Sequence, residues 1–466
     1  MRAANSPRRE NIPRQPLRMK SGLPIEPFLN EMQGEVRIPG SKSITNRALI
    51  LSALTQGETK LKGCLFSEDT EIMCNALDAL AIPVKRDINL GTICVQGNGG
   101  VWSQAEAELF VGNAGTTARF LTAMLCLHPS GRYQLDGTIA MRNRPMQGLL
   151  EALRKLGAKI ICHSKDGHFP FTIETSGLPG GIWEVDASQS SQILSALLMV
   201  APLAKSEVKL HLKGETVSKP FVSMTLKMMQ QFGAEIESEG LAETRISNTA
   251  RYKSVGNCWP VEPDATAASY FLALPGVVGG EAFLPGLQRE MLQGDIRFDA
   301  ILKQVGYKTH FIHKGIGSTA QPDDLRGGEF DFNAISDTFL TLAAIAPLLK
   351  GETRITGIAH TRKQETDRIN AMATELRRLG QRVEETDDSI HIFPNRRALH
   401  AKAIEGVHIE TYDDHRVAMS FGILGSLDLR GDGSPWLTVL NPDCCSKTFP
   451  DFFEKLENLR QASVIE

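Results

Sequence analysis

The pattern of apolar and polar positions repeats along the chain. Five segments join an amphipathic helical run, a short break and the start of a strand. Their helices end at Ala81, Gly157, Gly233, Gly306 and Gly380, at intervals of about 75 residues. Glycine best tolerates the left-handed backbone that often follows a helix. The pattern therefore predicts a structural repeat whose helices end in left-handed caps.

A second pattern has the same period. Six short strand patterns each run into a polar elbow and then into an apolar helix, marked by Ser43, Gly115, Ser191, Thr266, Asp337 and His415. The helical stretches 193–204 and 339–349 are almost wholly apolar, so we expect them to be buried. The sequence thus predicts six βαβ-type units, each with two helices and about 75 residues long.

Six such units are too many for one hydrophobic core. We expect an α/β (α+β) protein of two similar domains, each with three units, and a break near Pro263. One domain would comprise residues 41–262, and the other residues 25–40 plus 263–466. The strand before Pro39 would pair with the second group.

The first 24 residues differ from the rest. They contain five Arg, one Lys, four Pro and a single acid, Glu10. Such a composition cannot bury a core, which predicts a disordered basic tail over residues 1–24. A transit peptide is an alternative, although those are usually richer in Ser.

Composition excludes several classes of protein. The 466 residues are 42% hydrophobic and 23% charged, which is typical of globular proteins, and the net charge of −3 gives no basic field for nucleic acid. No run of about 18 apolar residues predicts a membrane span. Eight cysteines without CxxC spacing indicate reduced thiols and a cytoplasmic protein.

The elbows are where chemistry is expected. A ring of similar units would direct six helix N-termini at one region, where backbone N–H groups favour anions. Ser, Asp and Asn at these positions could equally be simple helix caps. Because basic residues accompany the elbows, we favour a shared site for an anionic ligand.

Two elbows of the first half carry the basic residues. Lys42 and Ser43 follow a tight Pro-Gly turn, and Arg47 lies one helical turn further on. In the stretch 112–119, glycines would let a ligand approach the backbone, and Arg119 could bind that ligand or a nearby carboxylate. Arg142 and Arg144 could bind carboxylate or phosphate with two hydrogen bonds each, or be a solvated pair.

Further candidates follow along the chain: Ser190, Ser191 and Gln192 before an apolar helix, Asp337, the charged run 362–368, the stretch 413–416 and the stretch 446–450. A carboxylate such as Asp337 near cations could accept a proton from a substrate hydroxyl. No cluster has convincing metal-ligand spacing, and neither a phosphate-binding P-loop nor a dinucleotide motif is present.

A family resemblance is carried by motifs that follow one another along the chain: PGSKSITNRAL, GNAGTTARFL, RNRP, SSQILSALLM, VSKP, EPDATAASYFLA, QGDIRF, QETDRI, DDHR and SKTFPDFF. From about Pro24 to Leu459 the chain resembles the enolpyruvylshikimate phosphate (EPSP) synthase family. The resemblance implies two domains, each of three βαβαββ-type units, with the active site in the cleft between them.

The resemblance also implies an activity: transfer of the enolpyruvyl group of phosphoenolpyruvate to the 5-hydroxyl of shikimate 3-phosphate, in the pathway to aromatic amino acids. It implies Lys42, Asp337 and Glu365 as catalytic residues. Shikimate 3-phosphate would contact Ser43, Arg47, Ser190, Ser191, Gln192, Ser218, Asp337 and Gln364. Phosphoenolpyruvate would contact Lys42, Asn113, Gly115, Arg144, Gln192, Arg362, Arg416 and Lys447. No metal, organic cofactor, nucleic acid or membrane is implied, and the family indicates a cytoplasmic monomer.

Three positions depart from the family pattern. Gln364 stands where the pattern R-x-K-E-x-D-R has Lys, and the adjacent Lys363 is expected to point elsewhere. Phe221 replaces a common Tyr, and Phe120 a common Pro. Two alternatives follow: a ligand-binding homologue with weakened catalysis, suggested by Gln364, and the related enolpyruvyl transferase acting on a UDP-aminosugar. The latter has Lys-Asn at its first elbow, where this chain has Lys42-Ser43.

Overall fold

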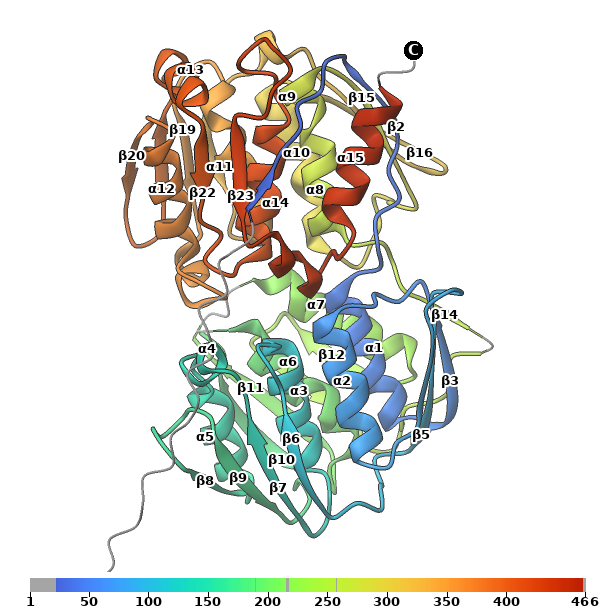
Figure 1. The fold of residues 1–466 in the computed structure, drawn as a ribbon. Helices are drawn as coiled ribbons and strands as arrows, with labels where there is room; N and C mark the ends of the chain where they lie inside the picture. The colour runs from blue at the N-terminus through green and yellow to red at the C-terminus, as the bar shows by residue number, and fades with distance from the viewer. Residues whose placement is uncertain (1–21, 189, 215–217, 257, 464–466) are drawn as a thin grey trace, which may run out of the picture.

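The computed structural model describes residues 22–188, 190–214, 218–256 and 258–463. Its buried apolar side chains form two clusters. One draws on residues 44–261 and the other on residues 25–38 together with 265–459. We call residues 41–262 the lower half and residues 22–40 plus 263–463 the upper half, after their positions in Figure 1.

The lower half contains three four-stranded sheets. The first has the order β14 (Trp259–Pro260), β3 (Gln56–Lys62), β5 (Thr92–Asn98) and β4 (Val84–Asp87). The second has the order β6 (Glu106–Phe110), β7 (Gly131–Asp136), β9 (Phe171–Thr175) and β8 (Lys159–Cys162). The third has the order β10 (Gly181–Asp186), β11 (Val208–Lys213), β13 (Glu243–Ile246) and β12 (Ile236–Glu239).

The upper half contains two four-stranded sheets and one of three strands. The first has the order β16 (Lys308–Ile312), β17 (Gly315–Thr319), β15 (Gly280–Pro285) and β2 (Met32–Glu35). The second has the order β18 (Glu329–Asp331), β19 (Thr353–Thr356), β21 (Ile390–Phe393) and β20 (Arg382–Glu385). The third has the order β1 (Gly22–Pro24), β23 (Leu437–Leu440) and β22 (Val407–Ile409).

All six sheets share one topology. The strand that precedes an elbow lies parallel to its neighbour, as β6 does to β7, and the remaining pairs are antiparallel, as in β7, β9 and β8. In the last sheet β22 and β23 are parallel, and β1 pairs antiparallel with β23. The predicted mixed fold of repeated units is therefore confirmed.

Strand β1 corrects the expected tail. Its register aligns Gly22 with Leu440 and Pro24 with Thr438, so residues 22–24 are paired in a sheet. The prediction of a disordered tail over residues 1–24 is wrong for these last three residues. The remaining part, residues 1–21, lies outside the described residues.

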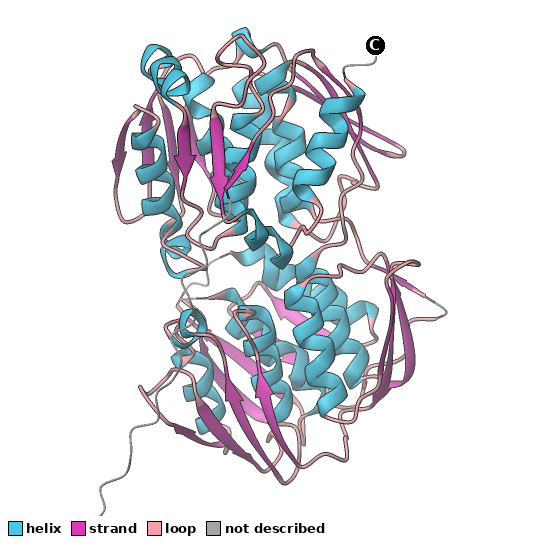
Figure 2. Cartoon of the chain, in the orientation of Figure 1, coloured by secondary structure: helices cyan, strands magenta, loops and turns pink. Residues whose placement is uncertain are grey.

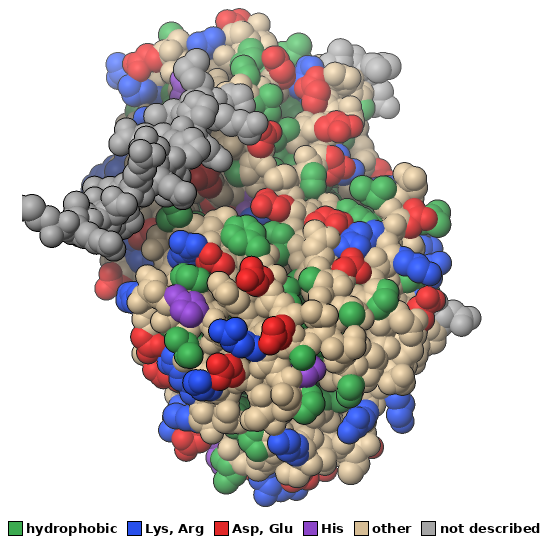
Figure 3. Space-filling model, turned by 60° about the horizontal axis from the view of Figure 1, so that its bottom comes forward, with side chains coloured by type: hydrophobic (Ala, Val, Ile, Leu, Met, Phe, Trp, Pro, Cys, Tyr) green, Lys and Arg blue, Asp and Glu red, His purple; other side chains and the backbone are tan. Residues whose placement is uncertain are grey.

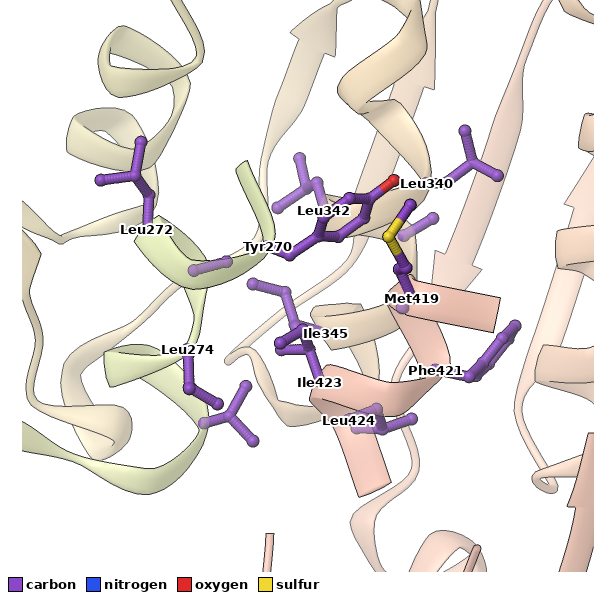
Figure 4. Packing of buried hydrophobic residues seen from close by; sticks show 14 of the residues in the cluster. Tyr270, Leu272, Leu274, Leu340, Leu342, Ile345, Met419, Phe421, Ile423 and Leu424 are labelled. Carbon is purple, nitrogen blue, oxygen red and sulfur yellow. The ribbon is translucent and has the colours of Figure 1, made fainter. Parts of the chain in front are cut away.

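Six buried helices fill the two cores, one from each unit. They are α1 (Lys42–Leu54), α3 (Gly115–Leu125) and α6 (Ser191–Val200) in the lower half, and α8 (Ala265–Ala273), α11 (Phe339–Ile345) and α14 (His415–Gly425) in the upper half. Every residue of α3, α8, α11 and α14 is buried, as expected for helices enclosed on all sides. In Figure 2 the sheets lie around each half of the molecule, and these central helices run between the sheets. Figure 4 shows Tyr270, Leu342 and Ile423 of the three upper helices packed together.

A second set of helices lies further out: α2 (Glu68–Ala79), α5 (Gln147–Lys155), α7 (Lys219–Gln231), α10 (Phe298–Val305), α12 (Arg368–Arg378) and α15 (Phe452–Ala462). The remaining α-helices of the described residues are α4 (Ile139–Arg142), α9 (Pro275–Val278) and α13 (Arg396–Glu405). The left-handed caps predicted at the four glycines are confirmed, because φ is positive at Gly157, Gly233, Gly306 and Gly380, and φ is also positive at Ala81.

The chain passes between the halves twice, at one place. Gly40 and Pro263 form an isolated antiparallel bridge there. Strand β2 pairs parallel with β15 of the upper half, as the sequence indicated, whereas β14 pairs with β3 of the lower half. Two crossings side by side hold the elbows of both halves toward each other.

None of the described helices is long and apolar enough to cross a membrane. The face shown in Figure 3 carries acidic and basic side chains interspersed. The basic residues that matter for an anionic ligand lie instead between the two halves.

Candidate active site

A pocket lies between the two halves, where the buried helices begin. Five of the six predicted elbows contribute to it: the starts of α1, α3, α6 and α14, and the short 3₁₀ helix η4 (Ser336–Thr338) that leads into α11. The elbow at Thr266 lies outside it, but its cap Asp264 accepts a hydrogen bond from the backbone N–H of Lys42. The helices thus bring residues from distant parts of the chain to one place.

Lys42 enters the pocket from the first turn of α1. Ser41 caps this helix, its Oγ accepting a hydrogen bond from the Ile44 N–H at 3.4 Å. The Lys42 ammonium lies 3.3 Å from the Asp69 carboxylate on α2. Burial lowers the pKa of Lys42, although Asp69 opposes this effect. A lysine with a lowered pKa is better suited to donate and recover a proton.

Arg47 lies further along α1, and most of its N–H groups donate hydrogen bonds to other residues of the protein. Its guanidinium donates to Thr225 at 2.7 Å and to Ser195 at 3.2 Å. It also donates to the backbone oxygens of Ser43 and Phe221, leaving one of its five N–H groups for a ligand. Burial lowers the pKa of Arg47 to about 9.

The two unusual phenylalanines both face Arg47. Its guanidinium carbon lies 5.1 Å from the ring centre of Phe120 and 5.9 Å from that of Phe221. Such cation–π contacts contribute about 1 kcal/mol each. Both departures from the family pattern therefore serve to hold one cation.

The sequence left open whether Arg119 binds the ligand or has a structural role. It donates to the backbone oxygens of Gly115 and Pro145, both at 3.0 Å, and to the Gln192 side chain at 3.1 Å. All three partners are neutral. Arg119 also lines the pocket, where it fixes Gln192 and the turn that carries Arg144.

Arg144 is held against the start of α3. A Cβ added at Gly115 would lie 2.7–2.9 Å from the Arg144 guanidinium, so only glycine permits this approach. The Nε and one terminal nitrogen of Arg144 are buried without a hydrogen-bond partner among the described residues. The Glu365 carboxylate lies 4.0 Å away. The unsatisfied nitrogens are suited to bind an anion, since buried polar groups are costly when unpaired.

Asp337 accepts hydrogen bonds from two guanidinium groups. Arg368 donates to one carboxylate oxygen at 2.9 Å and Arg416 to the other at 2.8 Å. Gln364 donates to the first oxygen at 3.3 Å. Burial opposes ionisation, but the two cations outweigh it and lower the pKa of Asp337. Asp337 is therefore a carboxylate before any substrate binds.

Glu365 is the second ionised carboxylate of the pocket. It accepts from Lys447 at 3.0 Å and from Arg368 at 2.9 Å. Burial again opposes ionisation, and Lys447 and Arg368 outweigh it, so that the pKa of Glu365 lies well below its usual range. The Lys447 ammonium also donates to the backbone oxygen of Asn113, at 3.1 Å, in the opposite half.

Arg368 connects these carboxylates. It begins α12, is almost completely buried, and contacts Asp414 at 2.7 Å in addition to Asp337 and Glu365. Opposite charges at these distances raise its pKa further above its usual value. The result is a rigid network of cations and carboxylates in which each group fixes its neighbours.

Hydroxyl groups line the other end of the pocket. Ser190 caps α6, Ser191 begins it, and Ser218 caps α7 with a left-handed backbone at φ +51°. The Ser218 hydroxyl lies 3.1 Å from Nε2 of His360 in the opposite half, and the Ser336 hydroxyl lies 2.7 Å from the same nitrogen. Neutral hydroxyls beside cations suit a phosphate ester.

Sequence and structure comparisons agree on the family. A family model described as EPSP synthase (3-phosphoshikimate 1-carboxyvinyltransferase) matches residues 29–456. A 3-phosphoshikimate 1-carboxyvinyltransferase of Opitutus terrae is 50% identical over 447 residues, which cover 95% of this chain and 99% of that protein. The chain belongs to the EPSP synthase family.

A further curated relative and two solved structures are also similar to this chain. An enzyme of the same name from Shewanella baltica is 43% identical over 440 residues, 94% of this chain and 99% of its own. The fold matches the EPSP synthase of Acinetobacter baumannii with a TM-score of 0.74 at 23% identity, covering 94% of this chain and 98% of the other. The enolpyruvyl transferase NikO of Streptomyces tendae shares the fold, with a TM-score of 0.72 at 17% identity over 94% of this chain and 97% of its own.

The pocket gathers most residues selected through the EPSP synthase motifs. Those that line it are Lys42, Ser43, Arg47, Gly115, Arg144, Ser190, Ser191, Gln192, Ser218, Asp337, Gln364, Glu365 and Arg416. Lys447 and Asn113 adjoin it through the contacts of the Lys447 ammonium. Arg362 is the exception.

Arg362 points away from the pocket. Its guanidinium pairs with Asp367 at 2.7 Å and Glu385 at 3.2 Å, on the side facing β20 and β21. Arg368, in the same motif, lines the pocket instead. The placement of Arg362 therefore does not support contact with phosphoenolpyruvate, and Arg368 is the arginine of this segment that does.

Several lining residues were not selected from the sequence: Asp69, Thr116, Pro145, Ile193, His360, Lys363 and Arg368. Arg368 follows Glu365 by three residues in the QETDRI motif. This spacing of opposite charges could have indicated that Arg368 pairs with Glu365 at the site. Asp69 sits in an acidic first turn of α2, which reads as an ordinary helix start. Lys363 lines the pocket, contrary to the expectation that it points elsewhere.

Proposed function

We propose that this pocket is the active site for the reaction of the family: transfer of the enolpyruvyl group of phosphoenolpyruvate to the 5-hydroxyl of shikimate 3-phosphate. One observation carries the proposal. Two ionised carboxylates, Asp337 and Glu365, lie among cations from both halves. Such a site binds two anionic substrates and still holds groups that can accept a proton.

Shikimate 3-phosphate binds toward the hydroxyl end of the pocket. Its contacts are Ser43, Arg47, Ser190, Ser191, Gln192, Ser218, Asp337 and Gln364. The serines receive its phosphate, because they lie at the N-terminal ends of α1, α6 and α7, where backbone N–H groups favour anions. The 5-hydroxyl then lies at Asp337, the only carboxylate in this set.

Phosphoenolpyruvate binds at the cationic end. Its contacts are Lys42, Asn113, Gly115, Arg144, Gln192, Arg368, Arg416 and Lys447. Arg144 offers nitrogens without partners, and Arg368 and Arg416 are already held in place by Asp337. Guanidinium groups fixed in this way bind carboxylate and phosphate without further ordering cost.

The reaction is an addition followed by an elimination. The 5-oxygen bonds to C2 of phosphoenolpyruvate while the hydroxyl loses its proton and the methylene carbon gains one. In the second step the resulting methyl group loses a proton, the bond from C2 to the phosphate oxygen breaks, and inorganic phosphate leaves. The first step therefore removes a proton from the 5-hydroxyl and adds one to the methylene carbon. The second step removes a proton from the methyl group as the phosphate leaves.

The residues of this chain can perform those transfers. Asp337 accepts the proton of the 5-hydroxyl; the substrate anions compete for Arg368 and Arg416, which loosens their hold on Asp337 and raises its basicity. Glu365 and Lys42 lie on the other side and exchange protons with the methylene carbon and the departing phosphate. General acid–base groups of this kind typically contribute about 10²–10⁴-fold each.

The two halves act as domains, with boundaries at 25–40 plus 263–466 and 41–262, in this proposal. Separate apolar clusters and residues of one site on both sides of the pocket support it. The chain works as a cytoplasmic monomer, which the family resemblance and the reduced cysteine pattern support.

The decisive experiment is an assay of the purified full-length chain with both substrates. Phosphate release that requires both, together with a product mass equal to shikimate 3-phosphate plus the enolpyruvyl group, is the expected result. Binding of shikimate 3-phosphate without turnover would instead favour the weakened homologue. If the chain neither bound shikimate 3-phosphate nor turned it over, the proposal would be overturned.

A further inference from the structure

Lys363 is an exposed cation at the edge of the pocket, and it forms no ion pair with any residue that the structure describes. We propose that Lys363 supplies the positive charge with which the upper half binds the phosphate of shikimate 3-phosphate, while Gln364 acts as a neutral bridge between Asp337 and Arg368. The inference rests on the proposed function.

The side chain of Gln364 is already in use at both ends. Its amide nitrogen donates to Asp337 at 3.3 Å, and its amide oxygen accepts from Arg368. A lysine at this position could replace the donor but not the acceptor, and its ammonium would face the Arg368 guanidinium. Position 364 therefore favours a neutral side chain. The positive charge that faces the substrate must then come from another residue.

The local backbone explains why Lys363 faces the pocket. Residues Ala359–Lys363 form the 3₁₀ helix η6, in which side chains three residues apart lie above one another. Lys363 therefore projects from the same face as His360. The His360 ring is fixed at the pocket by Ser218 and Ser336.

Three other cations at the site are paired with carboxylates, whereas Arg47 and Arg119 donate hydrogen bonds to neutral groups. Lys42 faces Asp69, Arg416 faces Asp337, and Lys447 faces Glu365. Lys363 alone among the lysines of the described pocket lining lacks a carboxylate within ion-pair distance. It also projects from the same face of η6 as His360, whose ring contacts the Ser218 hydroxyl, where we propose that the phosphate of shikimate 3-phosphate binds. An unbalanced cation there attracts and holds that phosphate.

The first test removes the charge. Lys363→Gln should raise KM for shikimate 3-phosphate, and weaken its binding measured by calorimetry without phosphoenolpyruvate, by about tenfold, the loss of one charge-assisted hydrogen bond. The KM for phosphoenolpyruvate and kcat should change less than threefold. Lys350→Gln, at an exposed lysine remote from the pocket, is the matched control and should behave as the parent. A KM and an affinity within twofold of the parent would overturn the inference.

The second test moves the charge to position 364. Gln364→Lys should lower kcat by about tenfold, because it breaks the bridge to Arg368, and it should not restore substrate affinity in a Lys363→Gln background. Restoration of parental kcat/KM in the double variant would show that position 364 is the natural place for the charge, and would overturn the assignment. An inactive parent would refute the proposed function, whereas the calorimetric comparison of parent and Lys363→Gln would still decide this inference.

Discussion

The ammonium of Lys447 donates a hydrogen bond to the backbone oxygen of Asn113 at 3.1 Å, and these two residues belong to different halves of the molecule. The same ammonium lies 3.0 Å from Glu365, so a contact between the halves is also a contact with a proposed catalytic carboxylate. At the other end of the pocket, Ser218 and His360 make a similar link at 3.1 Å. The site is complete only while the halves are together.

The first prediction concerns this closure. The contacts proposed for shikimate 3-phosphate lie on both halves, so its binding should favour the closed arrangement. Small-angle X-ray scattering of the protein should show a smaller radius of gyration when this ligand is added. An unchanged radius at saturating ligand, with binding confirmed by calorimetry, would contradict ligand-driven closure.

Removal of the Lys42 ammonium is expected to abolish nearly all turnover. Lys42→Ala deletes a buried cation that lies beside Asp69 and near Glu365, and that stabilises negative charge developing on the substrates. We expect kcat to fall by at least about 10²-fold in the phosphate-release assay. Lys350→Ala, with the same charge removed far from the pocket, should retain parental kcat. A near-parental kcat in Lys42→Ala would remove Lys42 from the mechanism.

Gly115→Ala should weaken phosphoenolpyruvate binding selectively. The new methyl group would meet the Arg144 guanidinium at 2.7–2.9 Å and displace it. We expect KM for phosphoenolpyruvate to rise by about tenfold or more, with a smaller change for shikimate 3-phosphate. Gly328→Ala is a suitable control, since its methyl group would approach nothing nearer than the Phe330 ring at 3.3 Å. Equal effects on both substrates would indicate general damage rather than displacement of Arg144.

Glu365 should link stability to pH. Burial opposes its ionisation, but Lys447 and Arg368 hold its pKa well below the usual range, so its contribution to folding is present above about pH 4.3 and is lost as the pH falls through its native pKa. Glu365→Gln should therefore lower the free energy of unfolding at pH 7 by about 3 kcal/mol. The difference from the parent should shrink in urea titrations below pH 4.

The exposed Glu384 provides a control for this pH effect. It pairs with Arg382 at the surface, so Glu384→Gln should change the free energy of unfolding by less than about 1 kcal/mol. A constant difference between Glu365→Gln and the parent from pH 7 to pH 3 would mean that the pKa of Glu365 in the native state is not lowered relative to the unfolded chain.

Two N-terminal truncations should behave differently. Residues 1–20 carry none of the family motifs, and their deletion should leave kcat/KM unchanged. Deletion of residues 1–24 removes β1 from its pairing with β23, which precedes the segment carrying Lys447, and should lower Tm. Thermal unfolding of both proteins beside the parent distinguishes them. Equal Tm values would show that β1 adds nothing to the last sheet.

Sequence patterns predicted the architecture because each repeat carries its own local signals. The glycines at 157 and 380 mark helix ends through backbone conformation alone, which needs no knowledge of distant contacts. Residues 22–24 were missed because three residues of an edge strand have no periodicity, and only Leu437–Leu440, more than 400 positions away, makes them a strand.

The candidate site was likewise predictable only where local signals mark its residues. Lys42, Asp337 and Arg416 lie at elbows and could be found as such. The choice between Arg362 and Arg368 depended on where η6 ends and α12 begins, and the orientation of Lys363 depended on η6 being a 3₁₀ helix. Neither boundary can be read from a run of charged residues, because α and 3₁₀ turns accept the same side chains.

The place where the chain crosses between the halves has a consequence for how this protein can be rearranged. Ser41 and Glu262 are joined by a backbone hydrogen bond of 2.8 Å, so the first and last residues of the lower half are neighbours. Every strand of the lower sheets lies between them, and every strand of the upper sheets lies outside them. The lower half is thus a self-contained insert, flanked by ends that already meet. Relatives could therefore exchange this insert as a cassette, with both junctions falling at one place between the halves and no sheet cut in either parent.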